Sequence, residues 1–248
     1  MKSFFVSLLL VAVIAGCSSS VDTARLDSQG HFDYAFSLYE DEDYLYAVNE
    51  LRSILLQYPG SAVNDDAQYY LGMSYFKREE FLLGAYEFSK LIRDIPASPF
   101  VPEAQYMLAE SYYQLSPPYP LDQSYTKKAV EEFQAFIDFF PANPRVEECE
   151  RKIEELNERQ AEKEYNAGFI YEKMEYYNAA MKYYQFVVDT YHDTKFAPIS
   201  LFRKIQIEIQ KDMNYEVLKD ISLFLEKYPE DQNASKVKEL QTELTAEG

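Results

Sequence analysis

The stretch that decides the fold is residues 71–96, LGMSYFKREEFLLGAYEFSKLIRDIP. Its two glycines, Gly72 and Gly84, stand twelve residues apart, and Pro96 follows twelve residues after the second one. Small residues at this spacing let two antiparallel helices approach closely, while large neighbours such as Phe88 fill the space beside the contact. We therefore predict two packed helices joined by a short turn and ended by a proline.

The same frame recurs in both directions along the chain. It appears 37 residues earlier with Ala35 and Ala47 at the small positions. A later copy has Ala109 and Ala129, which are twenty residues apart, so we expect eight extra residues in its inter-helix loop. The terminal prolines of these two copies are Pro59 and Pro141.

Two further copies follow in the C-terminal part. The fourth has Gly168 and Ala180 twelve residues apart, with His192 at the proline position. The fifth is degenerate, and its frame residues are Ile205, Val217, Ile221 and Pro229. A recurrent period of this length is typical of solenoid proteins.

This order of small residue, aromatic, small residue, aromatic and proline resembles the tetratricopeptide repeat. The resemblance implies an all-α, right-handed superhelical solenoid of about five repeats. Between the third and fourth copies, Val146, Cys149, Ile153 and Leu156 recur at helical spacing in a charged stretch. We expect a long helix there, linking an N-terminal half to a C-terminal half, with Cys149 as a small core residue.

The N-terminus resembles a bacterial lipoprotein signal. Lys2 precedes a short apolar run that ends in Ile14-Ala15-Gly16-Cys17, similar to a lipobox. The resemblance implies cleavage before Cys17 and acylation of its thiol and amino group, as in palmitate-bearing lipoproteins. An ordinary signal peptide with a coincidental cysteine is the alternative. Ser18 stands where an Asp would resemble an inner-membrane retention signal, so we expect the outer membrane, with the protein facing the periplasm.

These features divide the chain into five predicted segments. They are a signal peptide (1–16), a lipidated flexible tether (17–29), repeats one to three (30–143), the linking helix (144–164), and repeats four and five with a terminal helix (165–248).

Composition restricts the partners. The formal net charge is −18, so phosphate-rich nucleic acid and anionic surfaces would repel the chain, whereas basic protein surfaces would attract it. With Cys17 lipidated, Cys149 would be the only remaining cysteine, so no intramolecular disulfide is expected.

A closer resemblance is carried by the insertion in the third repeat, residues 116–126 (SPPYPLDQSYT), and by residues 161–167 (AEKEYNA). Together with the lipobox and the repeats, these are similar to the BamD family of outer-membrane assembly lipoproteins. The resemblance implies a scaffold and substrate receptor in the insertion of β-barrel proteins into the outer membrane. Its implied partners are the periplasmic domains of BamA, held mainly by the C-terminal repeats, other Bam lipoproteins, and unfolded β-barrel substrates.

The sequence shows no candidate catalytic or metal-binding constellation. Its two histidines, His31 and His192, lie in different repeats, and no His-Glu-x-x-His motif or glycine-rich phosphate loop occurs. Acidic runs such as residues 40–43 are interpreted as solvated faces. We therefore expect no catalytic residues, no metal and no cofactor, which makes an enzyme improbable.

The resemblance to tetratricopeptide proteins also implies which side chains face the concave surface. The nine candidates for a peptide groove are Phe32, Phe36, Tyr39, Tyr69, Met73, Phe76, Tyr106, Glu110 and Tyr113. The other interpretation is that these rings pack between adjacent first helices as core. A tyrosine can do both, with a buried ring and a wet hydroxyl.

Two other functions remain open at this stage. A repeat lipoprotein that scaffolds cell-division or peptidoglycan enzymes would share the anchor and the repeats, although the insertion at 116–126 argues against it. A lipid-anchored hydrolase with an unrecognised site is the second.

Overall fold

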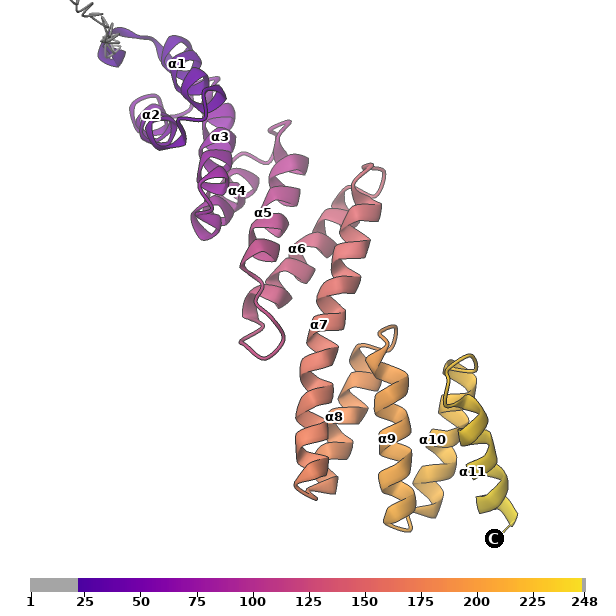
Figure 1. Ribbon diagram of the computed structural model, residues 1–248. Coiled ribbons are helices and arrows are strands. Elements are labelled where there is room, and N and C mark those ends of the chain that lie inside the picture. The colour runs from indigo at the N-terminus through magenta and orange to yellow at the C-terminus, as the bar shows by residue number, and fades with distance from the viewer. Residues whose placement is uncertain (1–21, 247–248) are drawn as a thin grey trace, which may run out of the picture.

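Pairs of helices related by the frame of residues 71–96 build the whole structure. The computed structural model describes residues 22–246, in which the chain forms helices and no β-strand. The elements are η1 (Thr23–Arg25), α1 (Ser28–Glu40), α2 (Tyr44–Gln57), α3 (Asn64–Lys77), α4 (Phe81–Asp94), α5 (Val101–Leu115), α6 (Ser124–Phe139), α7 (Val146–Lys173), α8 (Tyr177–Thr190), α9 (Phe196–Gln210), α10 (Asn214–Lys227) and α11 (Ala234–Ala246). Figure 1 shows them stacked in chain order as an extended solenoid, which confirms the predicted all-α repeat architecture.

The small residues of the frame do the packing that their spacing predicts. A Cβ atom added to Gly72 would lie 2.7 Å from Cε1 of Phe88, and one added to Gly84 would lie 3.2 Å from the carbonyl oxygen of Gly72. Gly168 is equally tight, with Tyr184 2.9 Å from the position of its absent Cβ. Helices α3 and α4, and helices α7 and α8, therefore touch through nearly bare backbone.

The turn between the two helices of a repeat is the same in four of the five repeats. Glu42, Glu79, Glu175 and Asp212 all have φ between 54° and 62°, the left-handed region. At the second of these turns, the Glu79 amide donates to the Phe76 carbonyl and the Glu80 amide to the Tyr75 carbonyl, which is the Schellman pattern. Each of these turns is only three residues long.

The third repeat differs because of its insertion. The loop between α5 and α6 has eight residues, Ser116–Gln123, five more than the other turns. The remaining three extra residues lengthen the ends of α5 and α6, so the prediction that all eight lie in the loop is wrong by three. Ser116 at the loop's start and Thr126 in α6 are joined by a 2.6 Å hydroxyl contact, which keeps the longer loop closed.

Helix α7 is longer than the predicted linking helix. It runs for 28 residues, about 42 Å, without a break at the predicted boundary between 164 and 165. Its first half packs on the third repeat, where Cys149 and Leu156 are fully buried. Its second half is the first helix of the fourth repeat, where Ala161 and Gly168 are buried. No proline interrupts the stretch, so one helix serves both halves.

The folded domain begins two residues earlier than predicted. Helix α1 starts at Ser28, and the carboxylate of Asp27 caps it by accepting from the Gly30 amide at 2.8 Å. The carbonyl oxygen of Leu26 accepts from the Tyr58 hydroxyl at 2.8 Å. The end of the predicted tether is therefore part of the first repeat, whereas Cys17 and the signal peptide lie outside the described residues.

Candidate protein-binding surfaces

The nine groove candidates lie on the first helices of the first three repeats, in three columns that differ in exposure. The inner column is buried, with Phe32, Tyr69 and Tyr106 exposing only 9%, 8% and 7% of their surface. Tyr69, for example, stacks on Phe100 with ring centres 4.6 Å apart. These three rings are core in this structure.

The middle and outer columns of the first two repeats are half-buried. Phe36 and Tyr39 of α1 both pack edge-on against Tyr70 of α3, with centroid distances of 4.7 and 5.1 Å. Phe76 packs against Phe81 at 5.1 Å, and Met73 lies at the edge of the same core. These side chains present ring edges at the surface between the helices.

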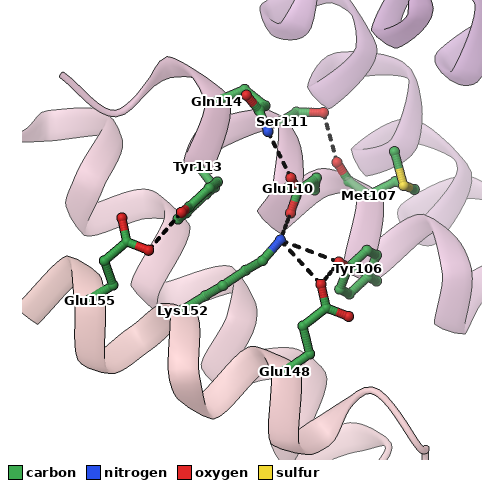
Figure 2. A network of polar contacts seen from close by, with 9 residues as sticks. All are labelled: Tyr106, Met107, Glu110, Ser111, Tyr113, Gln114, Glu148, Lys152 and Glu155. Carbon is green, nitrogen blue, oxygen red and sulfur yellow. Dashed lines mark hydrogen bonds and ion pairs between the residues drawn. The ribbon is translucent and has the colours of Figure 1, made fainter.

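In the third repeat, helix α7 covers the equivalent positions. Figure 2 shows Tyr106, Glu110 and Tyr113 of α5 facing Glu148, Lys152 and Glu155 of α7. The Tyr106 hydroxyl donates to Glu148, and the Tyr113 hydroxyl donates to Glu155, each at 2.7 Å. The two helices have matching i, i+4, i+7 spacing, so each residue of one row meets its partner in the other.

Lys152 is the centre of this network. Its ammonium group pairs with Glu110, lies 3.4 Å from Glu148, and sits 4.8 Å above the ring of Tyr113. Glu110 looks out of place in an otherwise apolar column, but it is the counter-charge of Lys152. The sequence signal that could have found this pair is the polar row on α7, which repeats the spacing of the column on α5.

The same contacts shift the ionisation of the groups in the network. Burial and the hydrogen bond to Glu155 raise the pKa of Tyr113 to about 12. Burial and then the hydrogen bond to Glu148 raise the pKa of Tyr106, while that bond lowers the pKa of Glu148. Both hydroxyls therefore stay protonated as donors to α7 and are not free for a ligand.

A groove lies where the two halves of the solenoid meet. It has a volume of about 720 Å³ and is bounded by α6, α7, the end of α8 at Thr190, and residues 191–194 of the turn that follows. Four glutamates of α7 line it, Glu150, Glu154, Glu155 and Glu158, with Arg151 among them. One wall is thus predominantly acidic.

Reactive groups are few in the described part of the chain. Cys149 is buried, and burial raises the pKa of its thiol to about 11, so it is not a thiolate at neutral pH. His31 is buried and bonds to Glu50 at 2.7 Å, whereas His192 is exposed beside Asp193. Among residues 22–246, no three His, Cys, Asp or Glu side chains are placed to hold a metal ion. None of the described helices is long and apolar enough to cross a membrane.

Repeated antiparallel helix pairs with small residues at their contacts define a tetratricopeptide-repeat protein. Residues 26–220 match the model of the family YfiO, described as outer membrane lipoprotein. The chain belongs to this family, the BamD family of lipoproteins.

Solved structures similar to this chain are other repeat proteins. One is a thermophilic TPR protein of Thermus thermophilus, 14% identical, with a TM-score of 0.37, covering 89% of this chain and 100% of that one. Another is a TPR repeats protein from Bacteroides fragilis, 12% identical, with a TM-score of 0.47 and coverages of 90% and 99%. The TPR domain of P58(IPK) is 17% identical, with a TM-score of 0.45 and coverages of 88% and 55%. A comparison with curated proteins finds no match.

Proposed function

We propose that the chain is a non-catalytic scaffold and substrate receptor in the assembly and insertion of β-barrel proteins into the outer membrane. The observation that carries the proposal is membership of the outer membrane lipoprotein family over residues 26–220. The lipobox-like stretch ending in Cys17 supports acylation there and attachment to the outer membrane, with the solenoid in the periplasm. Its partners in this proposal are the BamA periplasmic domains, other Bam lipoproteins and unfolded barrel substrates.

The substrate site that we propose is the half-exposed part of the predicted groove in the first two repeats. Its residues are Phe36, Tyr39, Met73 and Phe76, whose ring and thioether edges lie at the surface. Strands of outer-membrane barrels alternate apolar and polar residues and carry aromatic girdles. Spaced ring edges could accept alternate side chains of such a strand in extended form, while the buried inner column supports the wall from behind.

Paired substitutions separate a binding role from a packing role. Truncating the half-exposed ring in Tyr39→Ala should weaken the binding of a C-terminal barrel peptide by about 1–3 kcal/mol. Tyr69→Ala should instead cost about 3–5 kcal/mol in folding stability, because its ring is buried. Thermal unfolding and peptide affinity are measured on both variants. If folded Tyr39→Ala protein binds the peptide normally, the groove proposal fails.

For BamA we propose the groove between the two halves as the contact, with the C-terminal repeats on one side of it. Its acidic wall on α7 suits a basic segment of the partner. Glu150 and Glu154 are exposed, so the double substitution E150R/E154R should leave the fold intact and reduce the copurification of BamA from detergent-solubilised membranes several-fold. Glu216→Arg, an exposed glutamate on α10, is the matched control. Undiminished BamA recovery would refute this assignment.

A further inference from the structure

The outer faces of α2 and α4 carry exposed apolar side chains that neither the fold nor the proposed binding sites use. On α2 these are Leu45, Tyr46 and Leu56, and Leu56 exposes 80% of its surface. On α4 they are Leu82, Leu83 and Tyr86, of which Tyr86 exposes 59%. We call these six side chains the apolar outer face.

The apolar outer face lies at equivalent positions of the first two repeats and does not continue into the third. Leu45 and Tyr46 stand 37 residues before Leu82 and Leu83, so the two pairs occupy equivalent positions of consecutive repeats and point to the same side of the solenoid. The equivalent positions on α6 of the third repeat are two exposed lysines, 127 and 128. The paired apolar side chains at these positions therefore stop at the third repeat, and beyond it single exposed rings recur at Phe139, Phe186 and Tyr215.

Its polar residues are unusual for so acidic a chain. Besides the apolar side chains, the exposed residues of α2 are Asn49, Arg52 and Gln57, with no carboxylate among them. On α4 the exposed carboxylate is Asp94, at the far end of the helix, where it pairs with Arg93. Exposed Leu and Tyr side chains with an occasional Arg make up the composition of helices that lie in a membrane interface.

The position of the apolar outer face relative to the proposed anchor indicates what covers it. Asp22 is five positions after Cys17, so extended chain of that length reaches at most about 18 Å. The Leu26 carbonyl accepts from the hydroxyl of Tyr58, the residue directly after α2, so the chain from the anchor enters the fold beside the end of α2 that bears Leu56. We propose that the apolar outer face rests on the lipid surface in which Cys17 is anchored. This inference depends on the proposed lipidation of Cys17.

Contact with the bilayer surface would convert a flexible attachment into a fixed orientation. The contact is driven by apolar area, because the acidic turn at residues 40–43 next to α2 gives no attraction to anionic lipid. It should therefore persist at high salt, unlike a surface held by lysines and arginines. The side of α1 and α3 that bears the half-exposed rings would then keep a constant direction relative to the membrane.

Spin labels on the full-length lipoprotein test the contact. Labels are placed at L56C and Y86C on the face, and at K182C on the exposed side of α8 as the control. The native Cys149 is fully buried and stays unlabelled. The proteins are reconstituted in vesicles of phosphatidylethanolamine with a minor share of phosphatidylglycerol. Collision with oxygen, which concentrates in lipid, is compared with collision with a water-soluble nickel chelate.

We expect the ratio of oxygen to nickel accessibility at positions 56 and 86 to exceed that at 182 several-fold, at both low and high salt. Adding L82E/L83E should bring the label at 86 to the control value. Equal ratios at all three positions, in protein that floats with the vesicles, would overturn the inference while leaving the anchor intact. Labels shielded from both reagents would overturn it in favour of contact with a second copy of this chain, the only other protein surface in the vesicles. Protein that carries no acyl chains by mass and does not float would overturn the anchor and this inference together.

Discussion

Replacing Lys152 tests whether α7 is held to the third repeat by charge or by packing. Lys152→Met keeps the length of the side chain but leaves Glu110, whose side chain is 12% exposed, without its counter-charge. Breaking a fully buried pair costs about 3–5 kcal/mol. Because Lys152 itself is 18% exposed, water screens part of this cost, and we expect about 2 kcal/mol.

The double substitution is the informative control. With both Lys152→Met and Glu110→Met, no buried charge is left unpaired, because Glu148 is 39% exposed and keeps its hydrogen bond from Tyr106. The added apolar surface packs on the ring of Tyr113. We expect the double variant to recover most of the lost stability, giving a coupling energy of about 1–2 kcal/mol in a double-mutant cycle measured by urea unfolding. If the single variant costs less than about 0.5 kcal/mol, or if the two substitutions are additive, the ion pair does not hold this junction.

Three other substitutions test separate parts of the fold. Gly72→Ala should lower the free energy of unfolding by about 1–3 kcal/mol, since the new methyl group would meet the ring of Phe88; an unchanged urea midpoint would contradict the tight helix contact. Glu79→Gly should raise the free energy of unfolding by up to about 1 kcal/mol, because glycine adopts the positive φ without strain. A decrease in the free energy of unfolding would show that the turn holds glutamate without strain. Glu208 is buried, and this burial raises its pKa to about 7 from the 4.5 of an exposed glutamate. The contribution of Glu208 to the free energy of unfolding is thus fully present below about pH 4.5 and is lost as the pH rises to about 7. Above that pH, this contribution no longer changes. Urea unfolding across this range should show the slope, and Glu208→Gln should flatten it.

The repeat frame was predictable because close helix contacts require small residues at fixed spacing. Gly72 and Gly84 identify one helix pair, and the same spacing located Ala35 and Ala47 of the first repeat, both fully buried. The degenerate fifth repeat was located mainly from Tyr228-Pro229, which matches Tyr58-Pro59, and its frame residues Ile205 and Ile221 are also fully buried. Packing of this kind depends on local spacing, which a single sequence displays directly.

The arrangement of the third repeat against α7 was not predictable in the same way. Glu110 and Lys152 are 42 residues apart, and the only sequence signal that links them is the matching spacing of their rows on α5 and α7. The inner-column rings could be assigned to a helix face but not to groove or core, because their burial depends on the neighbouring repeat. The end of the linking helix was also missed. Residues 145–173 contain no proline to mark a boundary, and their one glycine, Gly168, serves a helix contact and does not end the helix.

The unbroken α7 couples the two halves of the solenoid in rotation as well as in distance. Each residue added to a helix turns everything after it by about 100° and advances it by about 1.5 Å. An insertion of one alanine near Asn157 would therefore swing repeats four and five to a different side of the first three, with hardly any change in length. An insertion of four alanines would bring them back to within about 40° of their original direction. Partners held on the two halves are thus kept in phase by the pitch of a single helix, and even a one-residue change in its length would disturb their alignment.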